Sequence, residues 1–256
     1  MNYLLYDDPA IKISLLPLTF TRPVAKIRIG IYTIAEKWEY FLNTSIFYST
    51  SAILQEKFSP LLPEGKCIFI NGAVCPTKEL IDEILNLQKG EVLVKGQIVI
   101  AYFDQPIGRQ KVFSNTLTII EHLWDIFTFN SLEIRSDFKI ISDQRKSHAI
   151  TDEHTRIYNS ENIFIEEGAT IRAAIINAEA GPVYIGKNAV VNEGVIIKGP
   201  FSLGEESHLT MGAKMRGDST IGPFSKVGGE VSNSVIFGYS NKGHDGFMGN
   251  TIIGEW

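Results

Sequence analysis

The sequence predicts two domains, an α/β domain followed by a left-handed parallel β-helix. Three observations lead to this prediction: a six-residue repeat toward the C-terminus, strands that alternate with amphipathic helices before it, and a length of 256 residues. The repeat occupies only about the last hundred residues, which leaves room for a second domain of ordinary size. We place the first domain at residues 1–150 and the β-helix at residues 151–256.

The six-residue repeat is the strongest pattern in the chain. Every sixth position from Ile185 to Val227 is aliphatic or Met, and the fourth position after each of these is mostly small. A period of six fits neither the 3.6 of a helix nor the 2 of a strand, so the chain must turn a corner after each short strand. Three such sides close a triangular coil of roughly 18 residues, and coils stack at about 4.8 Å around an aliphatic ladder. The eight ladder positions are Ile185, Val191, Ile197, Leu203, Leu209, Met215, Ile221 and Val227.

The repeat continues less regularly on both sides of this run. Ile165 and Ile171 begin a first coil, and the pattern restarts at Ile253. The intervening stretches 177–182 and 238–250 are rich in Gly and polar residues, so we expect them to be loops that project from corners.

In the first domain, short apolar runs alternate with amphipathic segments. The apolar runs predict strands at 2–7 and 66–71, and a hairpin at 91–95 and 97–103 around Gly96. Helices are expected at 33–42, where Thr33 and Glu36 form a capping box, and at 77–87 and 116–129. Residues 10–30 are predicted to be a loop, and 131–160 a polar connection. Alternation of this kind favours a mostly parallel sheet.

Composition excludes several classes of function. A net charge of −5 with no basic tract argues against nucleic acid as a partner. No apolar stretch approaches the roughly 20 residues of a membrane span, and the N-terminus lacks a signal-peptide pattern, so we expect a cytoplasmic protein. Cys67 and Cys75 form neither a metal quartet nor a redox motif and are interpreted as ordinary thiols.

Several segments together resemble a known family. These are Tyr6-Asp7-Asp8-Pro9, 15–25 and 28–38 in the first half, and 181–186, 199–201, 228–231 and 240–247 in the second. They resemble bacterial sugar-nucleotidyltransferase-like proteins, in which a nucleotidyltransferase-like domain is fused to hexapeptide repeats. The architecture is similar to that of the bifunctional N-acetylglucosamine-1-phosphate uridyltransferase/glucosamine-1-phosphate acetyltransferase. The resemblance implies a reduced nucleotidyltransferase-like first domain.

The resemblance implies a first site at the carboxyl end of the first strand. There a sugar-1-phosphate would attack a nucleoside triphosphate held with Mg²⁺, and pyrophosphate would leave. Arg22 is the main candidate for phosphate contact because a guanidinium can bind two phosphate oxygens; a surface ion pair or a loop brace is the alternative. Lys12, Lys26, Arg28 and Asn71 are further candidates for substrate binding. The metal ligands stay unassigned among the carboxylates Asp7, Asp8, Asp104 and Asp143.

The resemblance implies a second site in the stretch 238–250. His244 lies between Gly243 and Asp245, where the acetyltransferase relative has the histidine that takes a proton from the sugar amine as it attacks acetyl-CoA. The alternative is a structural hydrogen-bond partner. Further candidates that would hold sugar or phosphate groups are Tyr239, Asn241 and Lys242.

The resemblance also carries expectations about assembly and chain length. Hexapeptide acyltransferases assemble as trimers, so a homotrimer is expected. The repeats of the family continue beyond the position of Trp256, so we expect a chain truncated within the β-helix, with acetyl-CoA used by the intact protein only.

Three functions remain open from the sequence. One is an enzyme of sugar-nucleotide and amino-sugar metabolism, with nucleotidyl transfer and acyl transfer on separate domains. Another is a non-catalytic nucleotide- or sugar-binding regulator, favoured by the absence of Gly in residues 6–14 and by Asn71 at the position where catalytic relatives have Asp. A third is a purely structural trimerisation module.

Overall fold

The computed structural model describes residues 1–59, 61 and 63–256, which form two compact units. The first unit contains residues 1–27 and 32–123, and the second contains residues 28–31 and 124–256. The division by contacts differs from the predicted domain boundary after residue 150, since the helices after residue 123 are counted with the second unit. Each unit is described by itself.

The first unit is built on a six-stranded mixed sheet with the strand order β2-β1-β3-β5-β4-β6. Strands β1, β2 and β3 are parallel, whereas β5 runs antiparallel to both β3 and β4, so the predicted hairpin is confirmed. The strands are β1 (Asn2–Tyr6), β2 (Phe47–Ser49), β3 (Cys67–Asn71), β4 (Glu91–Lys95), β5 (Ile98–Phe103) and β6 (Arg109–Val112). The three parallel strands end at one edge, which we call the carboxyl edge.

In the first unit, the predicted helix starts agree with the structure better than the predicted loops do. The capping box of Thr33 and Glu36 opens α2, as the sequence indicates. The stretch 10–30 is only partly a loop, because Asp8 caps a short helix over residues 9–14 and two 3-10 turns follow. Strand β2 and the helix after it were not predicted. The helices are α1 (Pro9–Ser14), η1 (Leu18–Phe20), η2 (Val24–Lys26), α2 (Ile34–Leu42), α3 (Ala52–Phe58) and α4 (Lys78–Leu85).

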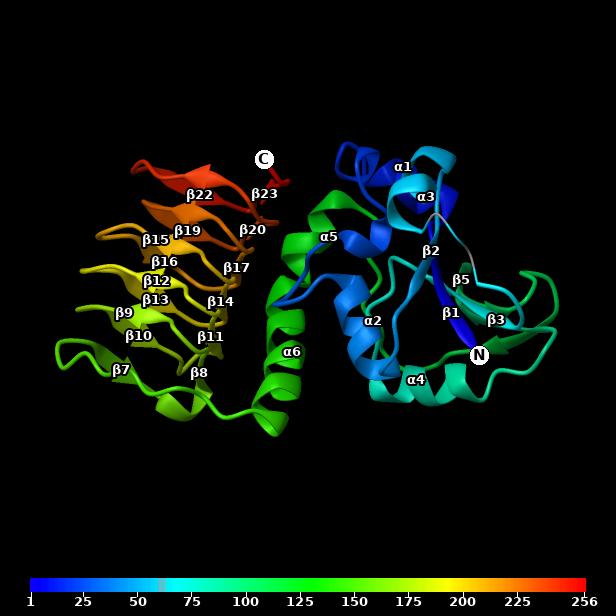
Figure 1. The fold of residues 1–256 in the computed structure, drawn as a ribbon, viewed down its shortest axis with the longest axis horizontal. Helices are drawn as coiled ribbons and strands as arrows, with labels where there is room; N and C mark the ends of the chain where they lie inside the picture. Colours follow the sequence, from blue (N-terminus) through cyan, green and yellow to red (C-terminus); the bar gives the residue numbers. More distant parts are fainter. Residues whose placement is uncertain (60, 62) are drawn as a thin grey trace. The chain divides into compact units, whose positions relative to one another are not determined.

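Two helices begin the main part of the second unit. They are α5 (Leu123–Thr128) and α6 (Asn130–Gln144). The prediction of a helix over 116–129 is therefore wrong for its first half, and α6 lies where a polar connection was expected. Helix α6 packs against strands β14 (Phe201–Leu203) and β17 (Ser219–Ile221) of the β-helix (Figure 1). No helix in the described ranges is both long and apolar enough to cross a membrane.

The remainder of the second unit is the predicted β-helix, with three parallel sheets whose strands stack in chain order (Figure 1). All eight ladder residues are 0–1% exposed and face the interior, so the six-residue repeat is confirmed. The first sheet contains β7 (Arg156–Tyr158), β10 (Ile175–Asn177), β13 (Ile196–Lys198), β16 (Lys214–Met215), β19 (Glu230–Ser232) and β22 (Phe247–Gly249). The second contains β8 (Ile163–Ile165), β11 (Val183–Ile185), β14, β17, β20 (Val235–Ile236) and β23 (Ile252–Ile253). The third contains β9 (Thr170–Ile171), β12 (Val190–Val191), β15 (His208–Leu209), β18 (Lys226–Val227) and β21 (Asn241–Lys242).

The expected projecting loop over 238–250 is largely wrong. Strands β21 and β22 lie within it, and only the corner 243–246 separates them. The sequence misleads here because Lys242 occupies an inward position, in register with the buried Val227. Its ammonium group donates to the backbone oxygens of Gly228, His244 and Gly246, at 2.8, 2.9 and 3.1 Å. Lys242 is half-buried, and these carbonyl groups replace part of the water that its ammonium group loses.

Candidate functional site

Asp7 organises the carboxyl edge of the first unit. Its side chain is 4% exposed and follows β1 directly. Its Oδ1 accepts a 2.8 Å hydrogen bond from the backbone N–H of Val24, and its Oδ2 accepts bonds from the Lys12 ammonium and the Thr50 hydroxyl. One carboxylate therefore connects the ends of β1 and β2 with helix α1 and with the loop 15–27, which is the part of the predicted loop 10–30 that carries Arg22, the main candidate for phosphate contact.

Lys12 lies at the same edge and borders a hollow. Its Nζ lies 2.8 Å from Oδ2 of Asp7, and it also donates to the hydroxyls of Thr50 and Ser51 at 3.0 and 3.2 Å. The adjacent hollow has a volume of about 280 Å³. Its walls are mostly apolar with a few polar groups, from Lys12, Ile13, Leu16, Thr19, Phe20, Ser51, Ile53 and Leu54. Such a mixture is typical of sites that take a small organic ligand with an anionic group.

Arg22 and Lys26 lie on the loop that closes this edge. Arg22 is 8% exposed, so its side chain belongs to the packed part of the loop. The Nζ of Lys26 lies 5.4 Å from the centre of the Tyr48 ring. Burial alone would lower the pKa of Lys26, but Tyr48 and two nearby glutamates raise it above its ordinary value, so Lys26 stays a cation.

Arg28 is not brought together with the other candidates of the loop. It belongs to the second unit, where its Nε donates to the backbone oxygen of Phe237 at 3.1 Å. The short segment 28–31 is held there by side chains of α6 and β17. Asn130 accepts from the N–H of Gly30, Asp137 accepts from the N–H of Ile31, and Thr220 donates to the oxygen of Gly30, each at 2.8 Å. Arg28 therefore has a structural position in this fold.

Asn71 ends β3 and is fully buried. Its Nδ2 donates to the backbone oxygen of Val99 at 3.1 Å, and its Oδ1 accepts from the N–H of Ala73 at 3.0 Å. One end of the amide thus ties β3 to β5, and the other fixes the turn after β3. The neighbouring Gly72 lets η2 pack closely, since a Cβ there would lie 3.2 Å from the Cβ of Ala25.

The candidate carboxylates of the first unit do not fit a resident Mg²⁺ ion. Both oxygens of Asp7 already accept hydrogen bonds, one of them from an ammonium group that a divalent cation would have to displace. Oδ1 of Asp8 caps α1 by accepting from the N–H groups of Ala10 and Ile11. Asp104 accepts from the N–H of Cys67 at the opposite edge of the sheet. Among the described residues no group of three or more His, Cys, Asp or Glu side chains could hold a metal ion.

The candidates of the second site lie within six residues on one coil of the β-helix, around β21. His244 and Asn241 are exposed and line one hollow of about 480 Å³ together with Thr210, Lys226 and Gly243. Tyr239 lies apart from them in an aromatic stack, with its ring centre 5.1 Å from Phe224 and 5.2 Å from Trp256. The ammonium group of Lys242 is taken up by backbone oxygens, as described above.

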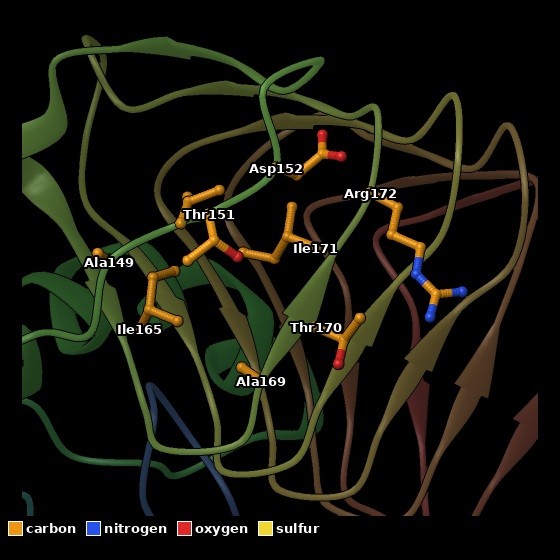
Figure 2. A pocket seen from close by; sticks show the side chains of 9 residues that line it. Ala149, Thr151, Asp152, Ile165, Ala169, Thr170, Ile171 and Arg172 are labelled. Carbon is orange, nitrogen blue, oxygen red and sulfur yellow. The ribbon is translucent and has the colours of Figure 1, made fainter.

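A further hollow lies at the first coil of the β-helix (Figure 2). It has a volume of about 280 Å³ and is lined by residues 149–152, Ile165 and residues 169–172. Oδ2 of Asp152 accepts from the N–H of Ala173 at 2.9 Å and from the hydroxyl of Thr155 at 2.7 Å, and these bonds lower the pKa of Asp152. In Figure 2 the Arg172 guanidinium is turned away from Asp152. The polar groups of this hollow hold the coil and do not converge on a ligand position.

Comparison with known proteins gives a decisive match for the first half of the chain. A sequence model of the sugar nucleotidyl transferase family matches residues 3–146, which is more than half of the chain. The chain belongs to the sugar nucleotidyl transferase family. No curated protein matches it at a significant level. The match covers the whole carboxyl edge, including Asp7, Lys12 and the loop 15–27.

The carboxyl edge contains residues that the sequence analysis did not identify. Thr50 and Ser51 lie beside Lys12 at the end of β2, and Ile53 and Phe20 form apolar walls of the hollow. The three-residue strand β2 gives no clear periodic signal, so the position of these residues at the carboxyl edge could not be inferred. On the β-helix, Thr210 and Lys226 were also missed, because they lie outside the stretch that resembles the acetyltransferase loop.

Proposed function

We propose that this protein is a sugar-1-phosphate nucleotidyltransferase of sugar-nucleotide metabolism. The observation that carries the proposal is the hollow at the carboxyl edge of a sugar nucleotidyl transferase domain, with Lys12 at its wall. Ligands of open α/β sheets bind outside the carboxyl ends of the strands, which is the position of this hollow. Its apolar walls suit a base or sugar ring, and the Lys12 ammonium would turn to a phosphate in exchange for its bonds to the hydroxyls of Thr50 and Ser51.

The reaction requires positioning and charge stabilisation more than covalent chemistry. An oxygen of the sugar-1-phosphate forms a bond to the α-phosphorus of a nucleoside triphosphate, the bond from that phosphorus to the bridging oxygen breaks, and pyrophosphate leaves. The triphosphate is taken up as its Mg²⁺ complex, so the metal is part of the substrate. Lys12 and Lys26 would offset the phosphate charge, and Arg22 would contribute once the loop 15–27 opens.

A non-catalytic nucleotide- or sugar-binding regulator is the second candidate. Two observations favour it: Asp7 is saturated with donors, and the amide of Asn71 is committed to the backbone. A site of this kind can bind a nucleotide through Lys12 and yet lack a carboxylate that is free to orient the metal of the substrate.

Pyrophosphate release tests these alternatives directly. Each nucleoside triphosphate is combined with a panel of sugar-1-phosphates and Mg²⁺, and thermal stability is measured on the same samples. Release with one pair of substrates supports the enzyme, and an increase in melting temperature without release supports the regulator. If neither is observed with any pair, both proposals for this edge are wrong.

For the β-helix we propose acyl transfer from acetyl-CoA to an amino sugar, performed by a cytoplasmic homotrimer. The amine nitrogen would attack the carbonyl carbon of the thioester while His244 accepts the amine proton; the carbon–sulfur bond would then break, and CoA would leave as its thiol. The exposed position of His244 beside Asn241 supports this role. In the proposed site Tyr239 and Lys242 fix the fold around it. Acetyl-CoA-dependent release of free thiol, lost in His244→Ala, tests the reaction, and sedimentation as a monomer would count against the trimer.

A further inference from the structure

The Lys12 ammonium group lies among three side-chain oxygens, which we call the oxygen cluster. It donates to Oδ2 of Asp7 at 2.8 Å and to the hydroxyls of Thr50 and Ser51 at 3.0 and 3.2 Å, so all three of its donors are used. The side chain of Asp7 is 4% exposed and that of Lys12 is 20% exposed. A carboxylate with hydroxyl oxygens beside it is also a ligand set that suits a hard divalent cation. In this fold an ammonium group of the protein occupies the position of such a cation.

The strand beside Asp7 ends in an amide and not in a second carboxylate. Asn71 at the end of β3 is in register with Tyr6, the residue before Asp7. Its amide is buried, and both of its ends are bonded to backbone groups, at 3.1 and 3.0 Å. Asp8 accepts from the N–H groups that open α1. The oxygen cluster therefore combines one carboxylate with one ammonium group, and a divalent cation would find no net negative charge there.

The oxygen cluster borders the hollow of about 280 Å³, because Lys12 and Ser51 both line it. A phosphate that enters the hollow can replace the two hydroxyls as the acceptor of two ammonium donors, while the third donor stays on Asp7. The ammonium group then bridges a carboxylate and a phosphate. In many other phosphoryl-transfer sites a Mg²⁺ ion makes a bridge of this kind.

We propose that the carboxyl edge binds the phosphates of a nucleotide without a metal ion held by the protein, and that the Lys12 ammonium takes the place of that ion; the nucleotide itself rests on the proposed function. Mg²⁺ then enters only as part of the triphosphate complex and adds nothing to its affinity. A triphosphate without Mg²⁺ carries more negative charge, so its attraction to the ammonium group is at least as strong. A site that holds the metal through carboxylates has the opposite dependence on Mg²⁺.

Calorimetry on the full chain tests this metal independence. ATP, CTP, GTP, UTP and dTTP are titrated in EDTA and in excess Mg²⁺ at equal ionic strength. For a triphosphate that binds, the affinity in EDTA should equal or exceed the affinity in Mg²⁺. A site that uses the metal as a bridge should instead lose roughly tenfold or more in EDTA, because it loses a contact to a charged group.

Two substitutions of Lys12 separate the bridge from simple charge attraction. Both remove the ammonium group, but Lys12→Ala leaves open space in the oxygen cluster, whereas Lys12→Met largely fills it with an apolar side chain. Mg²⁺ should therefore raise the affinity of Lys12→Ala roughly tenfold and change that of Lys12→Met by less than about twofold. Asp8→Asn alters a carboxylate that caps α1, so it is the matched control and should respond to Mg²⁺ as wild type does.

The outcomes separate this inference from the proposed function. A loss of roughly tenfold or more in EDTA for the wild type would overturn the metal-free site, and so would the absence of a Mg²⁺ effect on Lys12→Ala. If Lys12→Ala does not fold, the wild-type titrations decide by themselves. If no triphosphate binds in either buffer, the proposed function and this inference are both wrong. Pyrophosphate release together with metal-dependent binding would support the enzyme and overturn only the role of the ammonium group.

Discussion

Replacing Asp7 by Asn should destabilise the first unit by about 2 to 3 kcal/mol. Loss of one member of a buried ion pair costs about 3–5 kcal/mol, and the 20% exposure of the Lys12 side chain lowers this value because water can partly solvate the ammonium left behind. The new amide can still accept from the N–H of Val24, but it presents N–H groups toward the Lys12 ammonium and the Thr50 hydroxyl. The change is isosteric, so the effect measures the charge and its hydrogen bonds.

The assay is urea unfolding followed by tryptophan emission. Trp38 is fully buried in the first unit, so its emission shifts to longer wavelength when that unit opens. Asp8→Asn is the matched control, because Asn caps a helix as well as Asp and stability should change by less than about 0.5 kcal/mol. In the double variant with Lys12→Met, part of the loss should be recovered, since no unpaired ammonium remains. A loss below about 0.5 kcal/mol for Asp7→Asn, or strict additivity with Lys12→Met, would refute the view that Asp7 organises the carboxyl edge.

Three further predictions concern the second unit. Leu203→Ala leaves a cavity in the aliphatic ladder and should cost about 2–5 kcal/mol in chemical unfolding, so a loss under about 1 kcal/mol would contradict the ladder. Gly30→Ala places a Cβ 2.4 Å from Oδ2 of Asp137 and should lower the melting temperature well beyond Gly65→Ala, where φ is also positive but no atom lies within 4 Å; equal effects would show that the clash is relieved. The lowered pKa of Asp152 means that its carboxylate stabilises the fold above the ordinary aspartate pKa of about 3.9 and that this is lost as the pH falls through the lowered value. Asp152→Asn should therefore lose stability at pH 6 and be less sensitive to acid, and parallel pH profiles of the two proteins would argue against the two hydrogen bonds.

The ladder could be predicted from sequence because burial in a β-helix repeats locally. Every sixth position from Ile185 to Val227 is aliphatic or Met and points inward, and all eight of these residues are buried. The pattern fails where the local rule is broken. The corner at Gly228 and Gly229 is two residues shorter than those of the coils before and after it, so the period of six ends there. Lys242 then takes an inward position, where the repeat leads one to expect an aliphatic residue. The strands within 238–250 were missed for this reason.

The carboxyl edge was only partly predictable because its residues come together through long-range pairing. Asp7 and Lys12 are close in sequence, but their partner Thr50 follows a three-residue strand without a clear pattern. Arg28 shows the opposite error, since proximity in sequence to Arg22 suggested a shared role, whereas Arg28 belongs to the other unit. The sequence thus identified the family, while hydrogen-bond partners decide which side chains remain available for a ligand.

The most direct test of the central claim is the affinity of a nucleoside triphosphate for the carboxyl edge, measured by calorimetry with wild-type protein, Lys12→Met and Lys57→Met. Lys57 is an exposed lysine of α3 and controls for loss of one positive charge near the site. Lys12→Met should weaken binding by roughly tenfold or more, equivalent to at least about 1.4 kcal/mol, while Lys57→Met should stay within about twofold of wild type. Equal affinity for all three proteins would contradict the placement of the nucleotide site at Lys12.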